Sequence, residues 1–111
     1  MDAVRPHAEW QLGAPVEFVV HELRVAGDLG FAMLTAQRPG GGAIDVYATP
    51  GYARGDLDPT FSDGTDIQVL YKLSGDTWVA VHHALGATDV WWSWDPFCAE
   101  YGPVISDACN Y

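Results

Sequence analysis

Fifteen acidic side chains face only five basic ones in this chain of 111 residues, which gives a net charge of −10 at pH 7. This balance excludes nucleic acid and anionic membrane surfaces as partners, because binding their phosphate groups requires clustered lysines and arginines. The length is typical of one independently folding domain, so we predict a single domain over residues 1–111. Such acidity keeps a fold soluble, and it leaves a basic protein partner as an alternative.

Neither a membrane span nor an export signal is visible in the sequence. No run reaches the roughly 18 apolar residues that suggest a spanning helix. Residues 1–12 lack a basic region followed by an apolar core. We therefore expect either a cytoplasmic protein or a mature chain from which a signal peptide has been removed.

Residues 2–12 are predicted to form a short amphipathic helix. Val4, Ala8 and Leu12 recur at every fourth position, which places them on one helix face. Gly13 is a typical residue for ending such a helix. We expect the apolar face of this helix to lie across a sheet.

The segment after the helix alternates in the way that β-strands do. Residues 16–25 and 31–37 are predicted as antiparallel strands joined by a turn at Gly27. Residues 44–48 are predicted as a third strand. Residues 52–65 have no periodicity and are expected to form an irregular loop.

The hairpin within residues 66–94 organises the rest of the chain. Residues 67–73 and 78–85 are predicted strands around a turn at Gly75. The second strand is apolar on both faces, so both faces should be covered. We predict an α+β fold with one N-terminal helix on a curved, four- to five-stranded antiparallel sheet. An aromatic tail over residues 86–111, or a second copy in a homodimer, would cover the other sheet face, and the interior should be filled by its own side chains.

Cys98 and Cys109 are the only cysteines of the chain, and both lie in this tail. A disulfide between them would stabilise the fold by about 3 kcal/mol in the chain-entropy model. A bridged pair indicates a secreted or periplasmic protein, whereas two free thiols indicate a cytoplasmic one. Their spacing does not suggest a zinc site.

Two turns of the chain resemble those of a known superfamily. Residues 25–32 (VAGDLGFA) resemble a strand-turn-strand motif of small cystatin-like and NTF2-like proteins, and residues 73–81 (LSGDTWVAV) resemble the hairpin before their last strand. The resemblance covers residues 16–90. It implies a helix-on-sheet fold, and in the larger members an isomerase or dehydratase site with Asp, His or Tyr inside a cone. The single short helix here is closer to the minimal helix-plus-sheet form, many of whose bacterial members have no known function.

Five residues are candidates for acid–base catalysis if the protein is an enzyme, since proton transfer requires groups of these types. His82 and His83 are neighbours on one strand and must point to opposite faces. His21 is expected to approach one of them across the sheet. Hydrogen-bonded sheet histidines are the commoner alternative. The full set is His21, Asp45, Tyr47, His82 and His83.

Two further groups of residues suggest binding rather than catalysis. Four aspartates in and beside the irregular loop are a weak calcium candidate, because their spacing is not that of an EF-hand; they are Asp56, Asp58, Asp63 and Asp66. A tryptophan cluster is either cover for the sheet or a ligand or partner surface; it comprises Trp91, Trp92 and Trp94, with Asp89 beside it.

The sequence thus favours a small, acidic, non-catalytic binding or interaction domain without a cofactor. One alternative is a small isomerase or dehydratase with a His/Asp/Tyr acid–base set. The other is an acidic inhibitor or immunity-type protein that blocks a basic partner.

Overall fold

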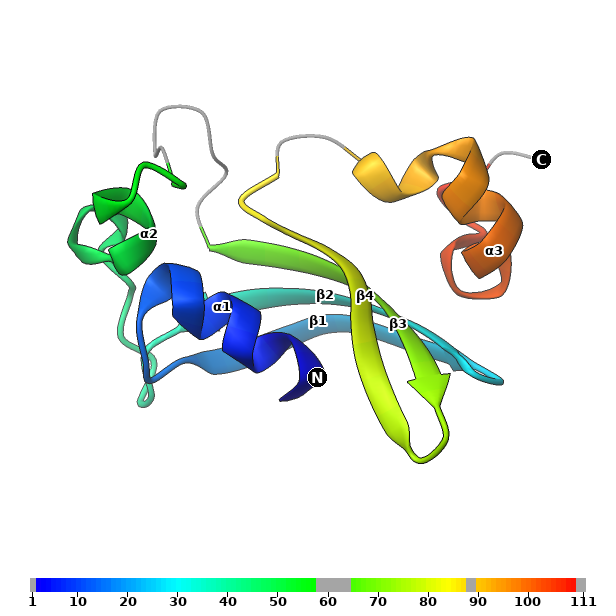
Figure 1. The fold of residues 1–111 in the computed structure, drawn as a ribbon, viewed down its shortest axis with the longest axis horizontal. Coiled ribbons are helices and arrows are strands. Elements are labelled where there is room, and N and C mark those ends of the chain that lie inside the picture. Colours follow the sequence, from blue (N-terminus) through cyan, green and yellow to red (C-terminus); the bar gives the residue numbers. More distant parts are fainter. Residues whose placement is uncertain (1, 58–64, 88–89, 110–111) are drawn as a thin grey trace.

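A four-stranded antiparallel sheet forms the middle of the molecule. The computed structural model describes residues 2–57, 65–87 and 90–109. The strands run as an up-and-down meander in the order β1-β2-β3-β4, so β1 and β4 are the two edges (Figure 1). They are β1 (Glu17–Ala26), β2 (Leu29–Gln37), β3 (Asp66–Ser74) and β4 (Thr77–Leu85). The N-terminal helix and this sheet confirm the predicted α+β class.

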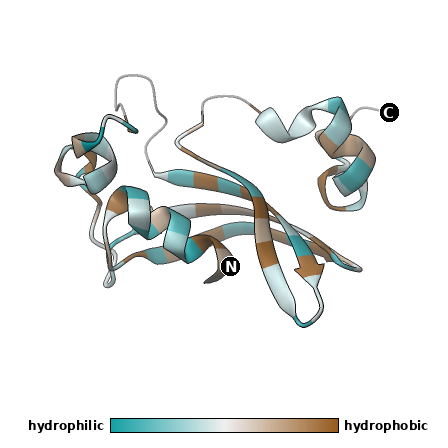
Figure 2. Cartoon of the chain, viewed as in Figure 1, coloured by the Kyte–Doolittle hydropathy of each residue, from teal (hydrophilic) through white to brown (hydrophobic). Residues whose placement is uncertain are grey.

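Helix α1 (Arg5–Leu12), which follows the 3₁₀ turn Asp2–Val4, packs on one face of the sheet. The predicted apolar stripe is confirmed, because Val4, Ala8 and Leu12 are all buried. Polar and apolar residues alternate along the strands beneath (Figure 2), so one side of each strand can meet the helix. The sheet residues buried against this helix include Ala32, Leu34, Ile67 and Val69.

The C-terminal segment covers the opposite face, as predicted, but it does so as a helix rather than as an irregular tail. Helix α3 (Asp95–Ile105) follows the 3₁₀ turn Trp91–Ser93 and lies at the other end of the sheet from α1 (Figure 1). Its Tyr101, Val104 and Ile105 are fully buried and share one helical face. Pro96 lies in the first turn, where a missing N–H costs nothing.

Covalent and ionic contacts hold α3 in place. The predicted pair Cys98 and Cys109 forms a disulfide, with Cα atoms 5.8 Å apart. Arg24 of β1 forms an ion pair with Asp107 just beyond α3, at 3.0 Å between Nη2 and Oδ2. Lys72 of β3 pairs with Glu100 of α3 at 3.0 Å. The α3 face of the sheet is therefore covered around Phe31 and Leu70, at the end of the sheet where α3 lies.

A β-bulge in β4 changes which of its side chains share a face. Leu70 pairs with His82 but Tyr71 pairs with Ala80, so Val81 is the extra residue. Trp78 and Ala80 therefore pack on the α1 side, whereas His82 lies on the α3 side. Simple alternation, which groups positions 78, 80 and 82 on one face, is wrong across the bulge.

The predicted third strand over residues 44–48 is wrong, because this segment is helical. It forms the 3₁₀ turn η2 (Val46–Ala48) and the short helix α2 (Pro50–Ala53). The Asp45 carboxylate accepts a hydrogen bond from the Tyr47 backbone N–H, and the Thr49 hydroxyl accepts one from the Tyr52 N–H. Such local caps compete successfully with strand pairing. No helix in the described part of the chain is long and apolar enough to cross a membrane.

Candidate ligand-binding cleft

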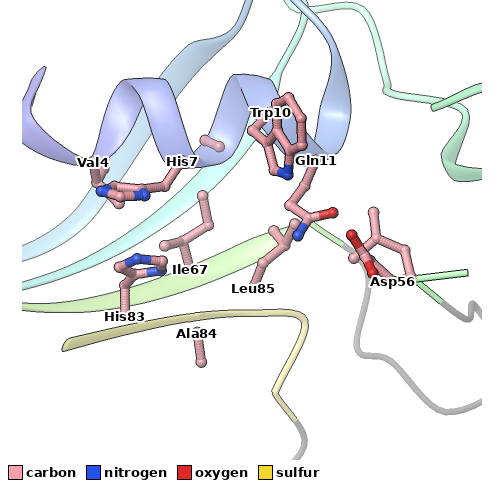
Figure 3. A pocket seen from close by; sticks show the side chains of 11 residues that line it. Val4, His7, Trp10, Gln11, Asp56, Ile67, His83, Ala84 and Leu85 are labelled. Atoms are coloured by element: carbon pink, nitrogen blue, oxygen red, sulfur yellow. The ribbon is translucent and has the colours of Figure 1, made fainter. Parts of the chain in front are cut away.

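A cleft of about 310 Å³ opens to solvent between α1 and β4 (Figure 3). Its floor is apolar, and its rim carries histidine, tryptophan, glutamine and aspartate side chains. This corrects the expectation of a filled interior: the space beneath α1 is packed, but its flank beside β4 is open. The residues that line the cleft are Val4, His7, Ala8, Trp10, Gln11, Asp56, Leu57, Ile67, His83, Ala84 and Leu85.

Helix α1 supplies one wall because its buried stripe fixes how the helix is rotated. With Ala8 and Leu12 facing the sheet, His7 and Gln11 fall one position to the side, one turn apart on the same flank. The C-terminal end of α1 is held by Arg38, whose guanidinium donates hydrogen bonds to the Leu12 and Pro15 carbonyls at 2.7 and 3.0 Å. The wall is therefore positioned by contacts outside the cleft.

Two histidines from distant parts of the sequence stack at the mouth of the cleft. The ring centroids of His7 and His83 are 4.4 Å apart, with an angle of 33° between the planes. Partial burial lowers the pKa of His83, and the nearby His7 and His82 lower it further. The His83 imidazole is thus neutral at pH 7. Among the described residues, neither ring has a hydrogen-bond partner, so all four nitrogens can serve a ligand.

Arg54, which directly follows α2, organises the far end of the cleft. Its guanidinium lies 4.2 Å from the Trp10 ring centroid and donates to the Trp10 carbonyl at 2.7 Å. It also donates to Gln11 Oε1 at 3.3 Å and forms an ion pair with Asp56 at 3.2 Å. The Gln11 oxygen and the Asp56 charge are therefore both engaged from outside the cleft.

Gly51 of α2 allows this close approach to α1. A Cβ at Gly51 would lie 2.5 Å from Gln11 Oε1, 2.7 Å from the Gln11 carbonyl oxygen and 2.9 Å from Leu57. Any side chain there would push α2 and the segment with Asp56 away from α1. The width of the cleft therefore depends on a glycine at this position.

The five predicted acid–base residues do not come together, and only His83 lies in the cleft. We expected His21 to approach His82 or His83, and this prediction is wrong because β1 and β4 are opposite edges of the sheet. Its Nε2 lies 2.6 Å from the Thr35 hydroxyl, which in turn donates to Asp66 at 2.7 Å. His21 is therefore an exposed histidine with a hydrogen bond across the sheet.

The other predicted catalytic candidates have separate surroundings. Asp45 caps the turn η2, and the exposed Tyr47 ring packs edge-on against Tyr52. His82 points to the α3 side, as its opposition to His83 predicted, and contacts Phe97 at 4.6 Å between ring centroids. Residues 44–48 do not form a strand, so they supply no face that Asp45 and Tyr47 share.

The predicted calcium loop is only partly described. Asp58 and Asp63 lie outside the described residues. Asp56 is paired with Arg54, and Asp66 accepts the hydrogen bond from Thr35. Within the described ranges, no three His, Cys, Asp or Glu side chains gather as a metal site.

The three clustered tryptophans have different roles. Trp92 is buried against Phe31, and Trp91 donates its indole N–H to Gln68 at 3.2 Å, so both cover the sheet. Trp94 is 62% exposed and lies edge-on to Phe97. Asp89 is outside the described residues. The predicted tryptophan surface is thus reduced to a single exposed indole in the described part of the chain.

Sequence reasoning missed His7, Trp10 and Gln11 as site residues. Their positions beside the apolar stripe were the available signal, because the flank of a helix borders whatever the helix covers. No local pattern showed that this flank would meet β4. Comparison with known proteins adds no site to carry over: no family model, no curated protein and no solved structure matches the chain.

Proposed function

We propose that the protein is a non-catalytic domain that binds a small organic molecule in the cleft between α1 and β4. The observation that carries the proposal is the lining of this cleft. The rings of His7 and His83, whose nitrogens have no hydrogen-bond partner in the described part of the chain, line the solvent-open space, and apolar side chains form its floor. Binding sites for small molecules combine an apolar surface with a few polar groups in this way.

Binding is favoured over catalysis by how the polar groups are held. A general base works when a second group orients it and its proton-accepting atom faces the substrate. His7 and His83 instead meet through their ring planes, and Asp56 is held by Arg54 rather than by either histidine. The isomerase or dehydratase alternative would have to use His83 without such an orienting partner in the described chain.

The minimal cystatin-like or NTF2-like relation is proposed on the same grounds. A helix laid across an antiparallel meander, with an opening at its flank, supports it at the level of fold. Export is proposed as well, since the Cys98–Cys109 bridge would be reduced in the cytosol.

A fragment screen followed by ¹⁵N–¹H NMR tests the proposed function. Fragments that bind should shift the resonances of His7, Gln11 and His83, and the shifts should saturate. The variant Gln11→Trp should abolish these shifts by filling the cleft. The matched variant Val79→Trp, at an exposed position of β4 outside the cleft lining, should retain them. The proposal fails if no fragment at millimolar concentration shifts the cleft residues, or if Gln11→Trp leaves binding intact.

A further inference from the structure

The polar groups of the cleft are mainly hydrogen-bond donors. The Trp10 indole can only donate, and in Figure 3 its nitrogen faces the open space below α1. Gln11 Oε1 is occupied by Arg54, which leaves the amide N–H₂ of Gln11 directed toward the cleft (Figure 3). His7 and His83 each carry one N–H when neutral and two when protonated. Up to four side chains can thus donate to one bound group.

Asp56, the one acidic side chain among the described lining residues, is already paired with a basic one. Asp56 lies at the end of the cleft and forms an ion pair with Arg54, which also lies over the Trp10 ring. The other described side chains of the lining are apolar and include Leu57, Ile67 and Leu85. Several donors beside an uncharged, apolar surface define the chemistry of a matching ligand.

We infer that the cleft takes a small monocarboxylic acid with an apolar body, its carboxylate against His7, Gln11 and His83 and its body on the apolar floor. This inference rests on the proposed function. A carboxylate provides acceptors only, so it can satisfy several donors at once, and hydrogen bonds to a charged acceptor are the stronger kind. Among the described lining residues, an amine would meet the Gln11 oxygen and the Asp56 carboxylate, which Arg54 already engages, and the uncharged acceptor nitrogens of the imidazoles.

The net charge of −10 does not decide against an anion here. Exposed charges more than about 8 Å apart are largely screened at physiological ionic strength. The acidic side chains away from the cleft therefore add a weak, general repulsion, whereas the donors act at contact distance. Arg54 at the rim offsets the nearest carboxylate.

Protonation of the histidine pair should be coupled to binding. In the free protein, burial and the neighbouring His7 and His82 keep the pKa of His83 below its ordinary value. A bound carboxylate would favour the imidazolium, so binding should take up a proton and tighten as the pH falls. Apart from the histidines, the charged side chain in the described lining is Asp56 at the far end of the cleft, where it is paired with Arg54.

Three probes with the same body and different head groups test the inference: hexanoate, hexanamide and hexylamine. Binding is measured by ¹⁵N–¹H NMR titration, with the Gln11 side-chain amide and the histidine rings as reporters, at pH 5.5, 6.5 and 8.0. Hexanoate should bind most tightly of the three. Its affinity should be about tenfold higher at pH 5.5 than at pH 8.0, which is the change expected if binding raises the pKa of one imidazole by about one unit. Hexanamide should bind more weakly and without pH dependence, and hexylamine should not bind.

Phenylalanine substitutions remove the donors while keeping a ring at each position. His83→Phe and His7→Phe should each weaken hexanoate binding about tenfold and flatten its pH dependence. His21→Phe, at an exposed position on the opposite edge of the sheet, is the matched control and should leave both unchanged. The two histidine variants are made and measured separately. If one of them fails to fold, the other variant and the probe series on the wild-type protein still decide the test.

The outcomes separate the inference from the function on which it rests. If hexanamide or hexylamine binds in the cleft as well as hexanoate, or if pH has no effect, the carboxylate inference is overturned and the binding function stands. If no probe shifts the cleft residues but fragments from the screen do, the inference again fails alone. If neither probes nor fragments shift them, both proposals fail.

Discussion

Each face of the sheet is covered by a helix, but the side under α3 is sealed by packing around Phe31 and Leu70, whereas the side under α1 is open at its flank beside β4. His82 and His83 show the difference at adjacent positions. His82 packs among the aromatic rings beneath α3, whereas His83 stands in the wall of a cleft beside α1. Because strand geometry sends neighbours to opposite faces, residue type alone cannot separate a packed histidine from a ligand-facing one. What covers each face decides the role.

The sealing of the α3 face has identifiable causes. Tyr101, Val104 and Ile105 of α3 pack in one cluster with Phe31 and Leu70 of the sheet. The ion pairs of Arg24 and Lys72 join the α3 segment to β1 and β3, and the Cys98–Cys109 bridge fastens α3 to the turn that follows it. Helix α1 is held at its C-terminal end by Arg38 and Arg54, and at its N-terminal end by Arg5, which donates to the Val16 carbonyl and lies over the Phe18 ring. None of these anchoring contacts comes from β4, and the flank of α1 beside β4 is the side where the cleft opens.

Removing the disulfide should have the largest effect and should act on the sealed face alone. The double variant Cys98→Ser, Cys109→Ser is expected to lose about 3 kcal/mol of unfolding free energy, since the bridge restricts the unfolded chain. Urea denaturation measures the loss, and ¹⁵N–¹H spectra should show changes around α3 but not at His7 or Gln11. Equal changes on both faces would contradict the separation of the two.

Gly51→Ala should be the most damaging small change on the open side. The new Cβ would lie 2.5 Å from Gln11 Oε1 and 2.7 Å from a backbone oxygen, so α2 must move. We expect a loss of about 1–3 kcal/mol, as for other overpacked sites. Gly42→Ala, where the nearest atom is 3.6 Å away, is the control and should change stability little. Equal stability of the two variants would show that α2 is not packed on α1.

Tyr101→Phe should be neutral or stabilising by up to about 1 kcal/mol, because it removes a buried hydroxyl without a partner. The Tyr101 ring is fully buried and its hydroxyl oxygen has no hydrogen-bond partner among the described residues. Tyr47→Phe, at an exposed ring, serves as the control. A clear loss of thermal stability in Tyr101→Phe would indicate that this hydroxyl has a partner on the sealed face.

The smallest effects are expected from pH, and the two faces should respond in different ranges. The pKa of His83 is lower in the folded protein than in the unfolded chain, so the unfolded chain binds the proton at a higher pH as the pH falls. The contribution of neutral His83 to stability is therefore present above about pH 6.5 and is lost below it. Arg24 lowers the pKa of Asp107, so that contribution is present above about pH 3.8 and is lost at still lower pH.

Two variants separate these ranges in denaturation curves from pH 3 to pH 8. His83→Gln should flatten the stability profile between pH 5 and pH 7 and leave the acid limb unchanged. Asp107→Asn should flatten the acid limb alone. The comparison of the two faces would be contradicted if His83→Gln changed the acid limb, if Asp107→Asn changed the range from pH 5 to pH 7, or if both variants changed the same transition.

Much of the fold follows from local patterns along the chain. The stripe of Val4, Ala8 and Leu12 set the rotation of α1, and the alternation around Gly75 set the hairpin. The patterns failed where neighbours only a few residues away supplied a better partner. Asp45 and Thr49 capped helical turns in place of a strand, and the spacing of Tyr101, Val104 and Ile105 was obscured by two prolines.

The sequence by itself determined which face of α1 is buried and that strands pair around Gly27 and Gly75, because periodicity and turn residues are local properties of the chain. It also supplied the two cysteines that bridge. Only the tertiary structure decided that His7 would meet His83 and that Arg54 would engage Gln11 and Asp56. These contacts join the first helix to the last strand and to α2, and they depend on how separate elements pack, which no local period encodes.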